Sequence, residues 1–151
     1  MIRPLSVADL DAAVELWYQA TTRAHHFIPA SFWHGQRAAM RDIYLPASES
    51  WVYEEGGQLL GFASYHQGAL AALFITPDKQ SQGLGRQLLD HLKERYERLD
   101  LRVYAQNKAA RRFYARNGFT EGEHQVCEHS GHAEIVMHWQ RGSSQVANNS
   151  T

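Results

Sequence analysis

Two glycines one residue apart, Gly83 and Gly85, follow a strongly apolar run and open a helical pattern. Glycine lets a backbone approach a ligand closely, and the unpaired N–H groups of a helix's first turn lie at the positive end of the helix dipole. We therefore expect residues 81–86 to bind an anion such as a phosphate or a pyrophosphate. A plain strand-to-helix turn, in which the glycines only relieve crowding, would use the same residues.

Two well-known phosphate loops do not fit this segment. The P-loop pattern needs Gly-Lys followed by Ser or Thr, and Arg86 follows Gly85. The dinucleotide fingerprint needs a third glycine where Leu88 stands, and it normally follows the first strand of its fold, whereas this loop follows the fourth expected strand. A Rossmann-type site is therefore disfavoured. Binding of ATP or NAD at this loop is an alternative that ligand-dependent stability can test.

The hydrophobic pattern predicts the elements that must position this loop. An apolar stretch over residues 1–5 predicts an edge strand, and Ser6 with Asp9 forms a capping-box pattern that begins a helix. The run Ala69–Thr76 is almost uninterrupted and predicts a central strand buried on both faces. Helices are also expected over 10–22, 29–45, 84–99 and 107–117, the last ended by Gly118, and strands over 51–54, 59–65, 101–104, 119–127 and 133–140. A Gly-Gly turn predicts a hairpin between the first two of these strands, and the last two are expected to form a closing hairpin. This order predicts an α/β fold with a mixed sheet.

Composition and charge narrow the class of protein. The chain has 151 residues, 44% of them apolar, which suits one domain over residues 1–141 followed by a polar, disordered tail over 142–151. Fifteen Lys and Arg against sixteen Asp and Glu leave a net charge of −1, so we expect neither nucleic acid nor a membrane as partner. The single cysteine, Cys127, excludes an internal disulfide. The chain shows no signal-type or spanning apolar segment, and we expect it in the cytoplasm.

Two segments together carry a family resemblance. Residues 80–85, Gln-Ser-Gln-Gly-Leu-Gly, match the pattern Gln/Arg-x-x-Gly-x-Gly/Ala, and residues 107–119 match Asn-x-x-Ala-x-x-Phe-Tyr-x-x-x-Gly-Phe. Both patterns are signatures of the GNAT acetyltransferases, which the chain resembles over nearly all of residues 1–140. Within that family it resembles the small bacterial members of the YjaB/YiaC type. The resemblance implies the GNAT or acyl-CoA N-acyltransferase fold, with about seven strands and four helices in the order β-α-α-β-β-β-α-β-α-β-β.

The resemblance also implies which residues bind acetyl-CoA and react with it. Backbone groups of Leu73, Phe74 and Ile75 would pair with the pantetheine arm as an added strand does. The pyrophosphate would be held by Ser81, Gln82, Gly83, Leu84, Gly85 and Arg86. Asn107 would contact the pantetheine and cap its helix. Tyr114 would lie near the thioester sulfur as the general acid, because a phenol can protonate the departing thiolate. Purely structural roles, as strand, turn, cap or core aromatic, are the alternatives for these residues.

The residue that takes the proton from the attacking amine is not evident from the sequence. Some relatives have a glutamate in the strand leading to Asn107, or an acidic residue early in the fourth strand. Arg102 and Ala71 stand at those positions here. His25, in the loop between the first two helices, is the candidate base because imidazole titrates near neutral pH. A substrate contact, or a water relay in its place, is the alternative.

The implied function is transfer of an acetyl group from acetyl-CoA to a primary amine, by direct attack in a ternary complex, in a monomer or a homodimer. The acceptor is expected to be a protein lysine or N-terminus, or else a small molecule such as an antibiotic or a polyamine. An acetyl-CoA-binding sensor without catalysis is the rival reading, because the carboxylate base is missing. We expect no metal: His124, His129 and His132 flank an exposed turn, and Cys127 is a strand residue rather than a nucleophile.

Overall fold

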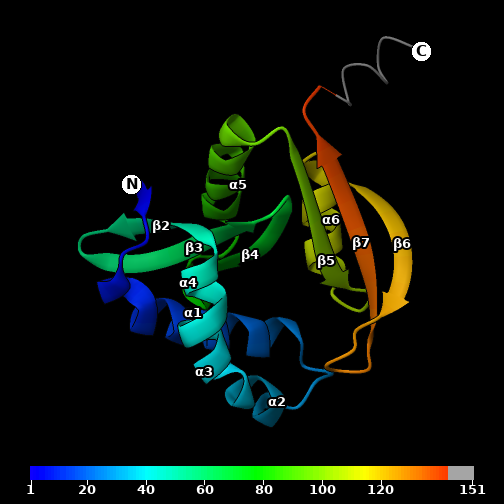
Figure 1. Cartoon of the computed structure of the whole chain (residues 1–151), viewed down its shortest axis with the longest axis horizontal. Coiled ribbons are helices and arrows are strands. Elements are labelled where there is room, and N and C mark those ends of the chain that lie inside the picture. The colour runs from blue at the N-terminus through cyan, green and yellow to red at the C-terminus, as the bar shows by residue number, and fades with distance from the viewer. Residues whose placement is uncertain (143–151) are drawn as a thin grey trace.

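One seven-stranded sheet, with strand order β1-β2-β3-β4-β5-β7-β6, is the centre of the computed structural model, which describes residues 1–142 (Figure 1). The strands are β1 (Ile2–Pro4), β2 (Glu49–Glu55), β3 (Gln58–His66), β4 (Ala69–Ile75), β5 (Arg98–Tyr104), β6 (Thr120–Val126) and β7 (Ala133–Gln140). Neighbouring strands are antiparallel, except that β4 and β5 are parallel. The tail expected over 142–151 lies outside the described residues, apart from Gly142.

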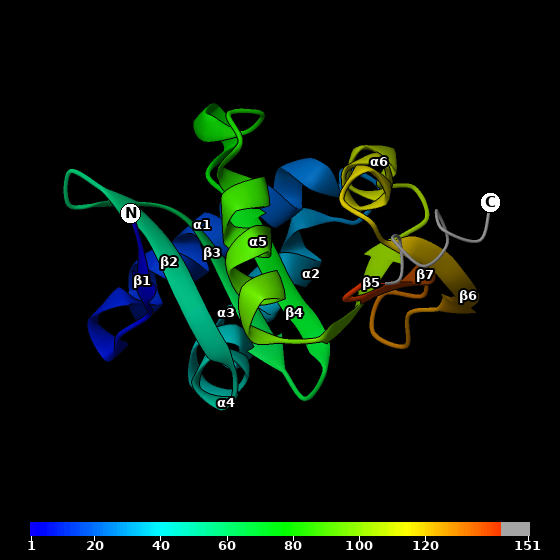
Figure 2. The same ribbon diagram turned by 90° about the horizontal axis from the view of Figure 1, so that it is seen from above.

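Helices cover both faces of the sheet (Figure 2). They are η1 (Val7–Asp9), α1 (Leu10–Ala24), α2 (Ala30–Gly35), α3 (Arg37–Ala39), η2 (Met40–Tyr44), α4 (Leu45–Ala47), η3 (Pro77–Lys79), α5 (Leu84–Arg95) and α6 (Lys108–Arg116). Phe62 and Ala63 are neighbours on β3 and point to opposite faces. Phe62 belongs to the core formed with α1, and Ala63 belongs to the core formed with α5. Each face of the sheet therefore has its own hydrophobic core.

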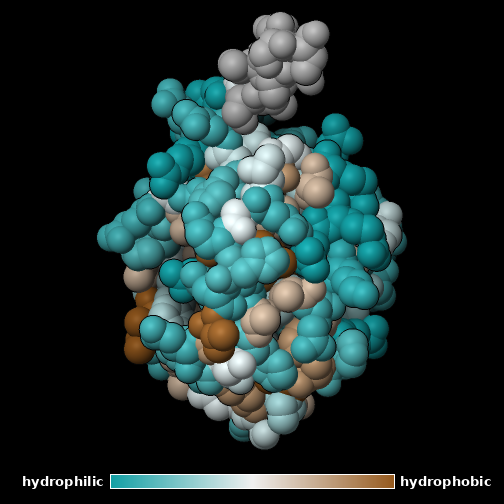
Figure 3. All heavy atoms as spheres, turned by 90° about the vertical axis from the view of Figure 1, so that its right-hand side faces the viewer, coloured by the Kyte–Doolittle hydropathy of each residue, from teal (hydrophilic) through white to brown (hydrophobic). Residues whose placement is uncertain are grey.

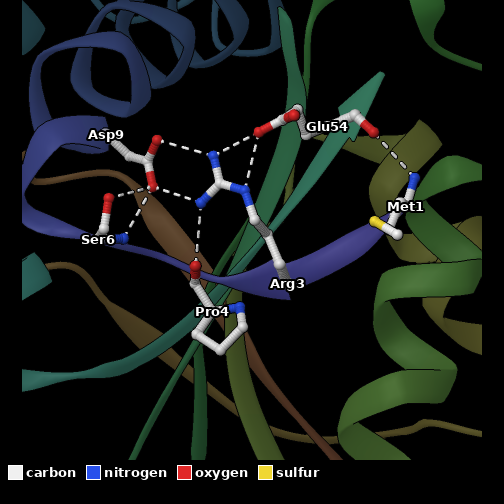
Figure 4. Close-up of polar contacts among 6 residues, drawn as sticks. All are labelled: Met1, Arg3, Pro4, Ser6, Asp9 and Glu54. Atoms are coloured by element: carbon white, nitrogen blue, oxygen red, sulfur yellow. Dashed lines mark hydrogen bonds and ion pairs between the residues drawn. The ribbon is translucent and has the colours of Figure 1, made fainter. Parts of the chain in front are cut away.

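Ion pairs of one arginine connect the first strand with the start of α1 and with β2 (Figure 4). Arg3 lies 2.7 Å from the Asp9 carboxylate and 2.6 Å from that of Glu54. The Ser6 N–H donates to the Asp9 carboxylate at 2.8 Å, and the capping box that Ser6 forms with Asp9 is confirmed. The Arg3 guanidinium, through its hydrogen bonds, holds the pKa of the Asp9 carboxyl well below its usual range.

Both predicted hairpins are confirmed. Gly56 and Gly57 join β2 to β3 with φ of 59° and 78°, the left-handed values that a two-residue hairpin turn needs at both positions. At the other end of the sheet β6 is the outer strand, and every residue of it is exposed. The face of the molecule on that side is predominantly hydrophilic (Figure 3).

The strands β4 and β5 separate soon after they begin. Ala69 and Asp100 are their one registered pair, whereas β4 pairs with β3 along its whole length. The prediction that Ala69–Thr76 is buried on both faces is therefore wrong. Ala71 is exposed and the last three residues of β4 are half-buried, because no strand closes that edge. The central position of this strand, fourth of seven, is confirmed.

Two helix boundaries also differ from the prediction. The helix expected over 29–45 is divided into α2, α3, the π-helical η2 and α4, and it continues past Pro46. Pro46 lies in the first turn of α4, which directly follows the π-helical segment. Leu99 belongs to β5, because α5 ends at Arg95 and the backbone is extended at Tyr96. Otherwise the order of elements confirms the predicted mixed α/β fold. No helix within residues 1–142 combines the length and the apolar character needed to cross a bilayer.

Candidate functional site

A cavity of about 700 Å³ occupies the space where β4 and β5 diverge. This volume is within the usual size of small-molecule sites. Its wall on one side comes from β4, the loop before α5 and the start of α6, and on the other side from α1, α2, η2 and β5. The cavity therefore connects the predicted anion loop with the loop between α1 and α2, which lie far apart in the sequence.

The predicted anion loop forms one end of the cavity, lined by Ser81, Gly83, Gly85 and Arg86. Ser81 and Gly83 have φ of 66° and 86°, so the chain turns through the left-handed region just before α5. The first helical hydrogen bond is donated by Gln87 to the Gly83 carbonyl at 3.1 Å. The N–H groups before Gln87 are therefore outside the helical ladder and can bind an anion.

Two other residues expected to hold the anion do not line the cavity. Gln82 and Leu84 are not among the residues that line the cavity, and the Leu84 side chain is buried in the core. Arg116, one turn after Phe113 on α6, lines the same cavity, and Phe113 lies next to Gly85. Arg116 thus adds a second guanidinium that the sequence patterns did not single out.

The open edge of β4 carries backbone groups that can pair with an extended ligand. The Thr76 N–H donates to the Leu60 carbonyl at 2.8 Å, which makes these two a hydrogen-bonded pair of the β3–β4 ladder. Such pairs alternate along antiparallel strands, so Phe74, opposite Phe62, also bonds to β3. The backbone groups of Leu73 and Ile75 therefore point away from β3, into the gap. Among the three expected residues, these two can pair with an arm laid along β4, although the Ile75 carbonyl already accepts a hydrogen bond from Gln80 Nε2 at 3.1 Å.

Asn107 and His25 are brought together although they are 82 residues apart. Asn107 caps α6, because its Oδ1 accepts from the Ala110 N–H at 3.2 Å, and its Nδ2 lies 3.2 Å from His25 Nε2. His25 Nδ1 lies 2.9 Å from the Thr21 carbonyl. The His25 side chain is buried, and burial lowers its pKa to about 4. Both residues line the cavity.

Tyr114 lies on α6, on the side that faces the cavity. Its ring packs edge-on against Phe113 and Phe119, with centroids 5.2 Å and 5.4 Å away. Within residues 1–142 the Tyr114 hydroxyl has no hydrogen-bond partner. Burial raises the pKa of this hydroxyl above its usual value, so it remains a protonated phenol at neutral pH.

The far end of the cavity is aromatic and contains basic but no acidic side chains among its described lining residues. It is formed by Trp33, Met40, Tyr44, His66, Arg102 and Tyr104. Arg102 is exposed and makes no ion pair with residues 1–142. Trp33 and Tyr104 pack around the His25 ring. Sequence patterns did not indicate Trp33 or Met40, because their place in the site depends on how α2 and η2 pack against β5.

The histidines of the last hairpin do not form a metal centre with their neighbours. Across residues 1–142 no three His, Cys, Asp or Glu side chains are grouped so that they could hold a metal ion. His132 packs against Phe27, with ring centroids 5.3 Å apart. Cys127 is half-buried, and its sulfur lies 3.5 Å from the Tyr104 hydroxyl, which donates to it.

The split sheet, the anion loop and the cavity between them are the features of a CoA-type acyltransferase. The chain belongs to the GNAT acetyltransferase family: the model of the acetyltransferase (GNAT) domain matches residues 15–140. It is 41% identical over 120 residues to the peptidyl-lysine N-acetyltransferase YiaC of Escherichia coli K12, covering 79% of this chain and 82% of YiaC.

Solved structures agree in fold. The apo form of YjaB from Escherichia coli matches with a TM-score of 0.81 at 26% identity, covering 92% of this chain and 96% of YjaB. The PaiA N-acetyltransferase of Thermoplasma acidophilum, solved in complex with coenzyme A, matches with a TM-score of 0.76 at 19% identity, covering 93% and 98% of the two chains. The protein is thus an N-acetyltransferase with the GNAT fold, as the sequence motifs predicted.

Proposed function

We propose that the protein binds acetyl-CoA in the cavity between β4 and β5 and transfers its acetyl group to a primary amine of a protein, a lysine side chain or an N-terminus. The observation that carries this proposal is the continuous cavity: it runs from the free N–H groups before α5, past the open edge of β4, to Tyr114 and the aromatic end. These groups suit a pyrophosphate, a pantetheine arm and a thioester in that order. A cytoplasmic location is part of the same proposal.

In this arrangement the chain's own residues orient two substrates and move one proton. The backbone of Leu73 and Ile75 and the Asn107 amide hold the arm that ends in the thioester. The amine nitrogen attacks the carbonyl carbon in a ternary complex, the C–S bond breaks, and the sulfur leaves as a thiolate. Tyr114 donates its proton to that thiolate. Burial raises the pKa of the Tyr114 hydroxyl, so the residue holds its proton until the thiolate forms.

A water molecule takes the proton from the amine in this proposal. No carboxylate lines the cavity among the described residues, and Arg102 stands at the position where some relatives have a glutamate. The alternative base is His25, but one ring nitrogen lies against the Thr21 carbonyl and the other against the Asn107 amide. A cation at position 102 also lowers the pKa of a nearby ammonium, which helps a weak base to deprotonate it.

The acid-free lining also bears on the acceptor. Polyamines and aminoglycoside-type antibiotics carry several positive charges, and a site for them needs carboxylates to replace their hydration. The aromatic end offers Arg102 and His66 instead. It suits a single amine delivered on a chain, and Ile43 and Tyr44, both exposed, lie at or next to its rim. The name of YiaC, a peptidyl-lysine N-acetyltransferase, supports the same acceptor class.

Binding and turnover test this proposal separately. Acetyl-CoA at a hundred times its Kd is expected to raise the free energy of unfolding by about 2.7 kcal/mol and Tm by about 5–10 °C, and ATP or NAD is expected to do less. Release of free thiol is then measured across lysine peptides, N-terminal peptides, spermidine and an aminoglycoside. Stabilisation without thiol release on any acceptor would identify a sensor rather than an enzyme. No stabilisation by acetyl-CoA would contradict both readings.

A further inference from the structure

A row of hydrogen bonds connects the first turn of α6 with the end of α1 through His25. The Ala110 N–H donates to Asn107 Oδ1 at 3.2 Å, Asn107 Nδ2 lies 3.2 Å from His25 Nε2, and His25 Nδ1 lies 2.9 Å from the Thr21 carbonyl. Thr21 and His25 are both buried, with 1% and 8% of their surface exposed. The row therefore runs through the protein interior, from Thr21 to Asn107, the residue expected to contact the pantetheine.

The positions of the protons along this row follow from its two ends. A backbone N–H can only donate, so the Asn107 atom that faces Ala110 must be the oxygen, and its NH₂ group must face His25. Since that NH₂ group can only donate, His25 Nε2 must accept and carries no proton. The proton of the neutral imidazole is then on Nδ1, beside the Thr21 carbonyl, which can only accept. The Thr21 hydroxyl, whose oxygen lies 3.0 Å from the same nitrogen, can accept from Nδ1–H as well.

The surroundings of His25 favour the same neutral form. Its ring packs against Trp33, Tyr104 and Phe27, with centroids 5.4 Å, 5.0 Å and 5.8 Å away. No acidic side chain of residues 1–142 is bonded to it, and its burial lowers its pKa to about 4. A general base accepts a proton on a nitrogen that can reach the substrate. The unprotonated nitrogen of His25 is instead occupied by the Asn107 amide.

We propose that His25 is a positioning residue for acetyl-CoA: it holds the Asn107 amide so that the second hydrogen of Nδ2 is available to the pantetheine arm. The inference rests on the proposed function of the cavity and assigns His25 a role different from that of the base. The nitrogen atoms of His25 act through Asn107, and its ring helps to fix Trp33 and Tyr104 at the acceptor end. The α1–α2 loop thereby contributes to cofactor binding without touching the cofactor.

Binding of acetyl-CoA by variants at position 25 is the first test. His25→Phe keeps a ring but removes both nitrogens, and it is expected to weaken acetyl-CoA binding about tenfold by calorimetry. His25→Gln can still accept from Asn107 and donate to Thr21, and it is expected to recover most of that loss and to keep the pH profile of kcat. His26→Phe is the matched control, because His26 is the exposed neighbour and does not line the cavity.

A double-mutant cycle tests whether His25 acts through Asn107. Asn107→Ala alone is expected to weaken acetyl-CoA binding about tenfold, and the double variant with His25→Phe is expected to be no weaker than that. Independent roles would multiply the two effects to about a hundredfold, and this result would overturn the proposal.

NMR of the wild-type protein tests the proton position on His25 directly, without an activity assay and without depending on the folding of a variant. The ¹⁵N shifts of His25 are expected to show the Nδ1–H tautomer between pH 5.5 and 8. In Asn107→Asp, which keeps the cap but puts a carboxylate beside Nε2, the pKa of His25 is expected to rise. An Nε2–H tautomer in the wild type would overturn the proposal.

Three outcomes separate this inference from the function on which it rests. Wild-type protein that fails to bind acetyl-CoA contradicts the proposed function. Wild-type binding that His25→Phe leaves unchanged contradicts only the positioning role. A His25→Gln variant that binds acetyl-CoA normally, but loses turnover more than a hundredfold together with the acidic limb of its pH profile, would make His25 the base.

Discussion

Tyr114 is the residue on which the proposed proton transfer depends most directly. Replacing it with Phe removes one oxygen and leaves the contacts with Phe113 and Phe119 in place. We expect kcat to fall by about 10²-fold or more, the usual contribution of a positioned acid, while the Kd of acetyl-CoA changes little. Steady-state kinetics and calorimetry measure the two quantities. Tyr53→Phe, on β2 and outside the cavity lining, is the control, and full turnover by Tyr114→Phe would refute its role as acid.

Arg102 gives the aromatic end of the cavity a positive charge, where we propose that the acceptor amine binds. If its guanidinium disfavours polycationic acceptors, Arg102→Glu should shift the ratio of kcat/KM for spermidine over a lysine peptide by about tenfold in favour of spermidine, which corresponds to about 1.4 kcal/mol of charge interaction. Arg102→Gln should shift it less. Arg112→Glu makes the same charge change on an exposed residue outside the cavity lining and serves as the control. An unchanged ratio in Arg102→Glu would show that position 102 does not select the acceptor.

At the scale of elements, the turn into α5 combines a left-handed backbone at Gly83 with the proposed binding of a pyrophosphate. Gly83 has a φ of 86°, and a Cβ there would meet no atom within 4 Å, so its backbone conformation and not its space requires glycine. Gly83→Ala should therefore destabilise the fold by about 1 kcal/mol and weaken acetyl-CoA binding several-fold as the loop shifts. Gly35→Ala, also with open space but with an ordinary φ, should do neither. Denaturation curves and calorimetry compare the two variants, and equal behaviour would contradict this account.

Elements were predictable where one local signal decides them. The Gly-Gly turn between β2 and β3, the capping box of Ser6 and Asp9, and the cap of α6 by Asn107 all depend on residues close in sequence. The burial of β4 was predicted wrongly because it depends on whether β5 stays beside it. A strand whose apolar residues face a cavity has the same hydrophobic pattern as a strand whose apolar residues pack against a neighbouring element. The periodicity of one segment therefore cannot distinguish the two cases.

The same distinction applies to the candidate site. The anion loop, Asn107 and Tyr114 stood in recognisable motifs, and the structure places all of them on one cavity. Their roles in catalysis stay predictions that the variants above test. Three further lining residues could not be predicted from their spacing in the sequence: Trp33, Met40 and Arg116. They line the cavity because of how α2, η2 and α6 pack. The hydrogen bond between Asn107 and His25 joins residues 82 apart and could be found only in three dimensions.

At the scale of the whole molecule, the buried His25 makes stability depend on pH. The pKa of His25 is about 4 in the folded protein against an ordinary value of 6.5, so between these values the unfolded chain binds more protons than the folded one. The stability that comes from this residue is therefore complete above pH 6.5 and is lost as the pH falls towards 4. Burial also lowers the pKa of His91, so His91 changes the stability with pH in the same direction. The hydrogen bond to Asp100 raises the pKa of His138, so His138 changes it in the opposite direction. Asp9 loses its contribution only at lower pH, because its ordinary pKa is 3.8.

Comparison of variants isolates the pH-dependent stability that His25 contributes. From pH 7 to pH 5 the wild-type protein should lose about 2 kcal/mol of its free energy of unfolding through His25, and His25→Gln, which has no group that titrates there, should not lose this part. Urea denaturation at the two pH values measures both proteins. His26→Gln should lose as much as the wild type, since His26 is exposed. An equal loss in wild type and His25→Gln would mean that His25 is not held neutral by the fold, and both the buried row of hydrogen bonds and the positioning role built on it would fail together.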